Sequence, residues 1–165
     1  TDRRITYRNT IDNLHILDYD YYFRMTEALL AESIPQAMLI LNEILQKGFD
    51  GHQFVVGLCE HFRNLLVCKD PSTVTLLQVT GSVQQKYLAQ SAQASVSFLL
   101  SVLNLGNHCD LNYKTSKSQR LLVELTLMKM AHVPSAVDLG RDWARNNQNA
   151  QNGAAELKKK KLMPQ

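Results

Sequence analysis

The chain contains 165 residues, of which 45% are hydrophobic and 20% are charged, a composition typical of one folded domain rather than a disordered segment. No apolar run approaches the roughly 20 residues that a membrane-spanning helix needs. No apolar stretch follows the basic N-terminal residues, as it would in a secretory signal. The sequence does not begin with Met, so we expect a fragment or a processed chain.

The net charge of +3 is concentrated near the C-terminus. Six of the 18 Lys and Arg residues but only three of the 15 Asp and Glu residues lie beyond residue 132, so residues 1–132 carry no net charge. Nucleic-acid-binding domains usually present a basic surface, so we expect no direct nucleic-acid binding by the folded part. The run Lys158–Lys161 is interpreted as a solvated part of a polar linker.

The three cysteines, Cys59, Cys68 and Cys109, form no C-x-x-C pair. An odd number without such spacing argues against a disulfide framework and indicates a reducing, cytoplasmic compartment. Cys59 with His61, or His108 with Cys109, would supply at most half of the four ligands of a structural zinc site. We therefore expect no bound metal and interpret the thiols as structural or surface groups.

Helical periodicity begins near the N-terminus. ITYRNTIDNLHIL predicts a short helix that closes near Leu14. Leu17 and Asp18 then open a second helix through LDYDYYFRMTEALL, with Asp18 or Asp20 as its cap and Phe23 facing the core. The neighbouring tyrosines are expected to pack their rings near this junction and to direct their hydroxyls toward water or another domain.

Two helices with clear end signals follow. Residues 34–47 carry apolar side chains at i, i+3, i+4 and i+7, with Ser33 as N-cap and Gly48 at the C-terminal end. Asp50 caps the next helix, which Pro71 is expected to end.

The helical periodicity in the second half of the chain predicts longer helices. Residues 71–77 are expected to form a short helical turn, and one long helix is expected from 83 to 107. Ser116 or Ser118 caps a last helix, to about Ala131, that is apolar on nearly every side. Residues 133–165 lose the pattern and are expected to form a polar, flexible linker.

The predicted fold is therefore an all-α bundle of about five main helices. Its expected core residues are Phe23, Leu41, Phe54, Leu58, Phe62, Leu99 and Leu125.

Motifs of nucleotide binding and catalysis are absent from the sequence. It contains no G-x-x-x-x-G-K-[ST] phosphate loop, no G-x-G-x-x-G, no G-x-S-x-G and no H-E-x-x-H. Asp18 and Asp20 lie two residues apart near a helix start, where they point away from each other and suit the helix dipole. His52 and His61 are nine residues apart on different faces of one helix, and we interpret both as solvated polar positions.

A few side chains are candidates for a partner interface. Arg63 lies within the apolar stretch HFRNLLV, where it either keeps its head group in water or reaches a carboxylate or a partner. Arg120 and Glu124 are spaced i, i+4 on the very apolar last helix, as either an ordinary surface ion pair or a pair that orients another subunit. Tyr22 joins them because it lies beside the expected domain boundary.

The order of these features resembles the collar domain, domain III, of the gamma/tau subunit of bacterial DNA polymerase III, in a Bacteroidetes-like form. The stretches that carry the resemblance are LDYDYYFRMTEALL, AMLILNEILQKGFD, FVVGLCEHFRNLLVCKD and QRLLVELTLMKMAH. The resemblance covers about residues 17–132. The matching residues are Leu17, Asp18, Gly48, Asp50, Phe54, Leu58, Arg63, Arg120 and Glu124.

The resemblance implies that residues 1–16 end a preceding lid domain, that 17–132 form the oligomerisation domain and that 133–165 begin a linker. In that family the collar domains of five subunits pack into a ring that holds together the ATPases of the clamp loader, which loads the sliding clamp in DNA replication. The implied partners are other gamma/tau copies, delta and delta-prime. The chain itself is expected to be no enzyme and to bind no cofactor, because ATP and zinc belong to upstream domains.

Two alternatives remain open from the residues. The aromatic cluster at 19–23 could line the pocket of a helical ligand-sensing or adaptor domain unrelated to replication. The run Lys158–Lys161 could contact DNA directly.

Overall fold

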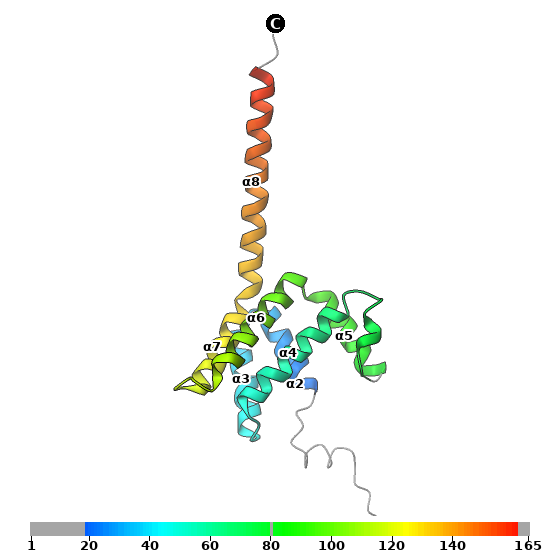
Figure 1. Cartoon of the computed structure of the whole chain (residues 1–165), viewed down its shortest axis with the longest axis vertical. Helices are drawn as coiled ribbons and strands as arrows, with labels where there is room; N and C mark the ends of the chain where they lie inside the picture. The colour runs from blue at the N-terminus through cyan, green and yellow to red at the C-terminus, as the bar shows by residue number, and fades with distance from the viewer. Residues whose placement is uncertain (1–18, 80, 162–165) are drawn as a thin grey trace, which may run out of the picture. The chain divides into compact units, whose positions relative to one another are not determined.

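The structure, a computed structural model, describes residues 19–79 and 81–161 (Figure 1). The described residues form α-helices and one 3₁₀ turn and contain no strand, so the predicted all-α class is confirmed. The elements are α2 (Tyr19–Leu30), α3 (Ile34–Gln46), α4 (Gly51–Val67), η1 (Val74–Leu76), α5 (Gly81–Gln93), α6 (Val96–Tyr113), α7 (Gln119–Ala131) and α8 (Val133–Lys161). The helix predicted to close near Leu14, the expected boundary at Leu17 and Asp18 and the proposed lid segment 1–16 lie outside the described residues.

The start of α3 follows the sequence signals closely. The Ser33 side chain accepts a hydrogen bond from the Gln36 N–H at 3.4 Å, and a proline stands in the first turn, where its missing N–H leaves no bond unmade. Gly48 follows the helix with φ +86°, a left-handed conformation that glycine adopts without steric cost. α3 therefore ends one residue before the predicted position, and Gly48 follows it as predicted.

α4 lies between the other helices of the bundle and packs against α2, α3, α5, α6 and α7. Asp50 caps it by accepting the Gln53 N–H at 2.9 Å, as predicted. The helix ends at Val67, four residues before Pro71, and η1 supplies the short turn expected at 71–77.

The long helix predicted from 83 to 107 is wrong, because two helices, α5 and α6, occupy this range and meet at a bend of 105°. Ser95 breaks the helix by capping α6, its side chain accepting the Phe98 N–H at 3.0 Å. Ala94, which precedes it, is buried. The bend raises the number of α-helices within the described residues up to Val133 to six, where the sequence predicts about five main helices.

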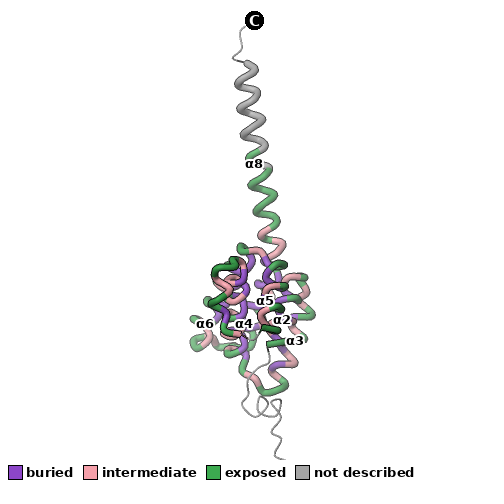
Figure 2. The backbone as a smooth tube through the Cα atoms, turned by 90° about the vertical axis from the view of Figure 1, so that its right-hand side faces the viewer, coloured by how far each residue is buried: buried purple, intermediate pink, exposed green. Residues whose placement is uncertain are grey.

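The core of the unit that ends at Val133 is formed by the facing sides of α2, α3, α4, α6 and α7 (Figure 2). Phe23, Leu41, Phe54, Leu58, Phe62 and Leu99 are all buried. Each fully buried Leu or Phe contributes on the order of 1.5–3 kcal/mol relative to an exposed side chain. The assignment of Leu125 to the core is wrong, because α7 buries the face that carries Val123, Thr126, Leu127 and Met130, and Leu125 stays 43% exposed.

Residues from Pro134 onward form a second unit, which contains all of α8 except its first residue, Val133. The sequence predicts a polar, flexible linker over residues 133–165, and the structure has a helix of 29 residues there. Its described side chains beyond Val137 are exposed, and they include Leu139 and Trp143. Ala, Arg, Gln, Glu and Lys favour a helix even where no apolar stripe exists, which is why hydrophobic periodicity does not detect this one.

No single helix among the described residues is long and apolar enough to cross a membrane. α5 and α6 reach the required length and composition only as a pair, which is bent.

Candidate functional site

The four side chains that the sequence selects as a partner interface lie on three helices. Tyr22 is on α2, Arg63 is on α4, and Arg120 and Glu124 are on α7. Tyr22 and Arg63 line two neighbouring pockets, which share Val56 and Glu60 of α4. The ion pair on α7 lines neither pocket, so the structure groups two of these four candidates around one helix and leaves the other two on a separate surface.

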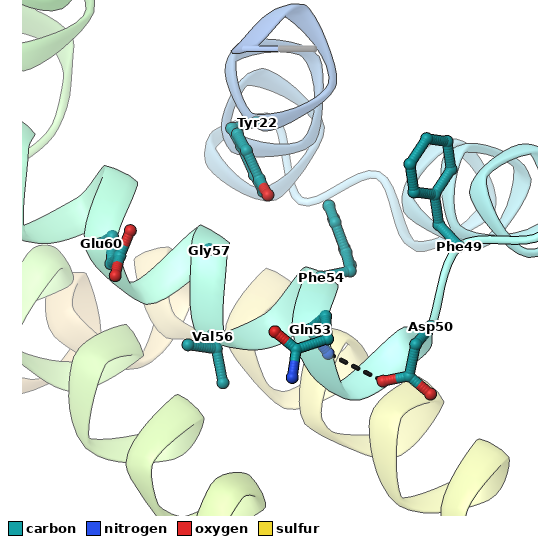
Figure 3. A pocket seen from close by; sticks show the side chains of 8 residues that line it. All are labelled: Tyr22, Phe49, Asp50, Gln53, Phe54, Val56, Gly57 and Glu60. Carbon is teal, nitrogen blue, oxygen red and sulfur yellow. Dashed lines mark hydrogen bonds between the residues drawn. The ribbon is translucent and has the colours of Figure 1, made fainter. Parts of the chain in front are cut away.

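The first pocket, of about 280 Å³, lies along α4 below the Tyr22 ring (Figure 3). Its residues are Tyr22, Phe49, Asp50, Gln53, Phe54, Val56, Gly57 and Glu60. Figure 3 shows Tyr22 reaching from α2 toward α4 beside Phe54, with Asp50 and Glu60 at opposite ends of the labelled part of α4. Asp50, Gln53 and Glu60 are exposed, so this pocket is a polar surface trough and not a deep apolar cavity.

Tyr22 is fixed between two buried rings. Its ring is parallel to Phe54 at a centroid distance of 5.7 Å, and His61 stacks at 6.1 Å. Gly57 makes room for the hydroxyl, because a Cβ at that position would overlap it and would lie 2.7 Å from the ring carbon that bears it. Burial, and then the negative charge of Glu60, raise the pKa of Tyr22 to about 12, so the hydroxyl is neutral near pH 7.

The second pocket, of about 440 Å³, is a groove between α4 and α6 and is called the α4–α6 groove below. It is lined by Val56, Cys59, Glu60, Arg63, Leu103, Gly106, Asn107 and Asp110. Arg63 is exposed, and its guanidinium donates to the Asn64 side chain at 3.1 Å. No ion pair of Arg63 is found among the described residues, so the carboxylate that the sequence allows as its target does not come from this part of the chain.

The floor of the α4–α6 groove depends on a close approach of the two helices. A Cβ added to Gly106 would overlap the Sγ atom of Cys59 and would lie 3.4 Å from Cε of Met130. Burial, and then the neighbouring Cys109, raise the pKa of the Cys59 thiol to about 11. A thiol of that pKa is almost entirely protonated near pH 7, so Cys59 is suited to packing and not to nucleophilic attack.

The ion pair on α7 has the geometry that its i, i+4 spacing predicts. Nε of Arg120 donates to Oε1 of Glu124 at 2.8 Å. The flanking leucines on the same side of α7 are exposed: Leu121 by 58% and Leu125 by 43%. An exposed pair of this kind contributes only a few tenths of a kcal/mol to stability. The α7 surface, defined as Arg120, Leu121, Glu124 and Leu125, therefore combines an ion pair with two apolar side chains that the unit leaves uncovered.

The two histidines that the sequence interprets as solvated are both placed otherwise. His61 is 1% exposed, with Nδ1 3.1 Å from the Tyr87 hydroxyl and Nε2 2.8 Å from Oε1 of Gln90. Burial lowers its pKa to about 4, although the Gln90 contact acts in the opposite direction. His52 is half-buried, stacks on Tyr113 at 4.4 Å and lies 2.5 Å from the Asp110 carboxylate.

These contacts join helices whose proximity the sequence does not predict. His61 and Gln90 link α4 to α5, and Nε2 of Gln90 donates to the Phe23 carbonyl of α2 at 2.9 Å. Among the described residues every buried side-chain N or O atom has a hydrogen-bond partner. One signal in the sequence pointed to this role for His61: it precedes Phe62 and lies three residues after Leu58, so it borders the apolar face of α4.

A second polar cluster joins α2 to α3. The Tyr21 hydroxyl donates to Glu43 at 2.6 Å, and Arg24 pairs with the same carboxylate at 3.2 Å. The hydrogen bond from Tyr21, and then Arg24, hold the pKa of Glu43 below its ordinary value. Lys47 contacts the Tyr21 hydroxyl and lies 5.1 Å from the centre of the ring. Tyr21 is therefore a buried structural residue, whereas the sequence treats it only as one of several junction tyrosines.

The titratable groups described above are engaged mainly in packing and hydrogen bonds. Within residues 19–79 and 81–161 no cluster of three or more His, Cys, Asp or Glu side chains could hold a metal ion. The buried histidine is satisfied by neutral partners, and the thiol in the α4–α6 groove is protonated. What the surface offers is the groove, the trough beside Tyr22 and the α7 surface.

Comparison with known proteins adds no relative: no protein-family model, no curated protein and no solved structure matches this chain.

Proposed function

We propose that this chain is the collar domain of a gamma/tau-type subunit of bacterial DNA polymerase III, and that it assembles the clamp loader by helix packing. The proposal rests on the order of features along residues 17–132, which resembles that family. Three of the residues that carry the resemblance also have clear roles in the structure: Asp50 caps α4, Gly48 adopts a left-handed conformation after α3, and Arg120 pairs with Glu124. Its function is then oligomerisation, with delta, delta-prime and further gamma/tau copies as partners.

The observation that supports an oligomerisation role best is the α7 surface. Leu121 and Leu125 are exposed on a helix whose opposite side is fully buried. An exposed leucine pair beside an ion pair suits a partner that covers the apolar side chains and is oriented by the charges. Obligate interfaces commonly bury more than about 2,000 Å², so these residues would form only one part of the contact.

The proposal carries further expectations that follow from the family. The chain itself would neither bind nor hydrolyse ATP, since the ATPase and zinc-binding regions would lie upstream. It would act in the bacterial cytoplasm as part of the replisome. Direct DNA contact through Lys158–Lys161 would contribute nothing to loading, so shortening the chain before Lys158 would leave assembly unchanged.

Sedimentation velocity tests the proposal. The chain is run alone and with purified delta and delta-prime subunits of a Bacteroidetes clamp loader, at equal concentrations. We expect it to sediment as part of a larger complex in the mixture. A chain that stays monomeric alone and joins no loader subunit would contradict the proposal.

The alternative, a helical ligand-sensing or adaptor domain, is supported by the α4–α6 groove and not by the tyrosines that suggested it. Tyr22 reaches a surface trough with polar walls, whereas the groove has an apolar floor of Val56, Leu103 and Gly106. An adaptor would bind its target through the groove without needing the α7 surface. A chain that joins no loader subunit, but binds another target that a groove substitution releases and an α7 substitution does not, would favour this alternative.

A further inference from the structure

Helix α5 is attached to the bundle in a different way from its neighbours. It buries only three side chains, Tyr87, Gln90 and Ser91, and two of these are polar. α4, by contrast, buries six side chains, and apart from His61 all of them are apolar: Phe54, Val55, Leu58, Phe62 and Leu65. Apolar burial provides most of the stability of packed helices, so α5 is held by an unusually small apolar contribution.

Hydrogen bonds hold α5 in place instead. Gln90 donates to the Phe23 carbonyl of α2 at 2.9 Å, and Ser91 donates to the Leu65 carbonyl of α4 at 2.9 Å. Lys69 also donates to the Ser91 carbonyl. Two further bonds connect His61 to Gln90 and to Tyr87, and the Asn64 side chain also bonds the Tyr87 hydroxyl.

The pattern of donors fixes one proton on His61. Because the Gln90 amide nitrogen donates to Phe23, its oxygen faces His61 and must accept a proton from Nε2. In the neutral ring the other nitrogen, Nδ1, carries no proton and accepts from the Tyr87 hydroxyl at 3.1 Å. A second proton would make Nδ1 a donor, so the Tyr87 hydroxyl would have to turn and accept, and the new positive charge would lie among neutral partners at a position that is 1% exposed.

The chain on each side of α5 is held in place by contacts that do not involve α5. α6 begins with its own cap, Ser95, and buries Phe98 and Leu99 in its first turn. Leu77, before α5, and Ala94, after it, are buried. α5 can therefore leave the surface without unwinding α6 or α4.

We propose that α5 is a detachable flap of the bundle, that neutral His61 is its latch, and that protonation of His61 opens the flap while the remaining helices stay packed. Opening uncovers the Phe23 ring, which lies 4.9 Å from Tyr87 and 4.7 Å from His61. Phe23 then becomes a new apolar surface beside Tyr22.

Burial gives the latch its sensitivity. It lowers the pKa of His61 to about 4, and the pKa of the ring would return toward 6.5 once α5 has left α4 and uncovered it. The neighbouring titratable groups come from all three elements: Tyr22 and Tyr19 of α2, Glu60 of α4, Cys68 just after α4, and Tyr87 and Lys86 of α5. With those two pKa values the open form gains about 25-fold between pH 7.5 and pH 5.

Native-state amide hydrogen exchange on the full chain tests the flap, measured by NMR at low urea concentrations. We expect the amides of α5 to open at least tenfold more often than those of α4, α6 and α7 at pH 7.5, with a weaker dependence on urea. Gln90→Ala should raise the opening of α5. The matched control is Thr126→Ala, which removes a buried hydroxyl bond in α7 and should raise only the opening of the other helices. If α5 amides open in step with α4 and α6 at every urea concentration, there is no flap.

The same measurement at pH 7.5 and pH 5, corrected for intrinsic exchange, tests the latch. We expect about 25-fold more opening of α5 at the lower pH in the natural chain. His61→Gln keeps a neutral donor and acceptor and should remove that dependence. Opening of α5 that does not change with pH in the natural chain, or changes equally in His61→Gln, would overturn the role of His61.

Discussion

The hydroxyl of Tyr22 lies directly over Gly57 of α4, at a distance that leaves no room for a Cβ atom. A glycine in the middle of a helix costs about 1 kcal/mol relative to alanine, so its presence needs a packing reason. Here the reason is the approach of α2 to α4, with Tyr22 stacked between Phe54 and His61.

Gly57→Ala should therefore destabilise the chain by about 1–3 kcal/mol, because the methyl group forces the Tyr22 ring out of its stack. Displacement also exposes the hydroxyl, so its pKa should fall from about 12 toward the ordinary value near 10. Urea unfolding and ultraviolet titration of the tyrosines measure both effects. Gly140→Ala is the matched control, since a Cβ there meets no atom within 4 Å. Equal stability of the two variants would refute this account of Tyr22.

Gly106 and Cys59 form a second pair whose fit can be tested by compensation. Gly106→Ala alone should cost about 1–3 kcal/mol, because the new methyl overlaps the Cys59 sulfur. Cys59→Ala shortens the opposing side chain, so the double variant should recover part of that loss. A double-mutant cycle from urea unfolding measures the coupling. Strictly additive effects would mean that the two residues do not limit the approach of α4 to α6.

His61 should make the stability of the chain depend on pH. Its pKa is lowered to about 4 in the folded state, so the unfolded chain binds more protons between about pH 4 and 6.5. Stability is thus fully present above pH 6.5 and is lost as the pH falls, by about 2 kcal/mol between pH 7 and 4.5. Urea unfolding across this range checks the loss. His61→Gln should flatten the curve above pH 4.5, and an unchanged slope would contradict the assignment.

The Cys59 thiol should be slow to alkylate. With a pKa of about 11 instead of 9, the thiolate fraction at pH 8 falls by about 100-fold. Cys68 and Cys109 are buried. Reaction of the folded chain with iodoacetamide at pH 8, followed by mass spectrometry of Cys59 peptides, should be at least tenfold slower than in urea. Equal rates would show that the thiol is neither buried nor protonated as described.

The sequence predicts well those features that depend on local chemistry. Ser33, Gly48 and Asp50 mark helix ends because a cap or a left-handed residue acts on its own neighbours. It predicts less well the features that an apolar pattern hides or that depend on a distant partner. Ser95 is a local cap, but the apolar pattern continues through it, so periodicity alone joins α5 to α6.

The candidate site illustrates the same limit. The Arg120–Glu124 pair is predictable because four residues on one helix determine its geometry. His61 is not, because its partners Tyr87 and Gln90 lie 26 and 29 residues away on another helix. Leu125 was misplaced because α7 is apolar on nearly every side, so that the pattern does not reveal which side faces the core.

A charge placed on the α7 surface should impair assembly more than a charge placed at any other exposed leucine. Leu121→Glu places a charge where the proposal expects an apolar contact, and desolvating that charge would cost several kcal/mol at an interface. The matched control is Leu39→Glu on α3, whose leucine is 65% exposed. Both variants should unfold at the same urea concentration as the natural chain, because neither side chain is buried.

The most direct test of the proposed oligomerisation role is sedimentation velocity of these three chains, each mixed with delta and delta-prime. We predict that the natural chain and Leu39→Glu sediment in the complex, whereas Leu121→Glu remains a free monomer. A natural chain that fails to join the complex, or a Leu121→Glu variant that joins it fully, would contradict assembly through the α7 surface.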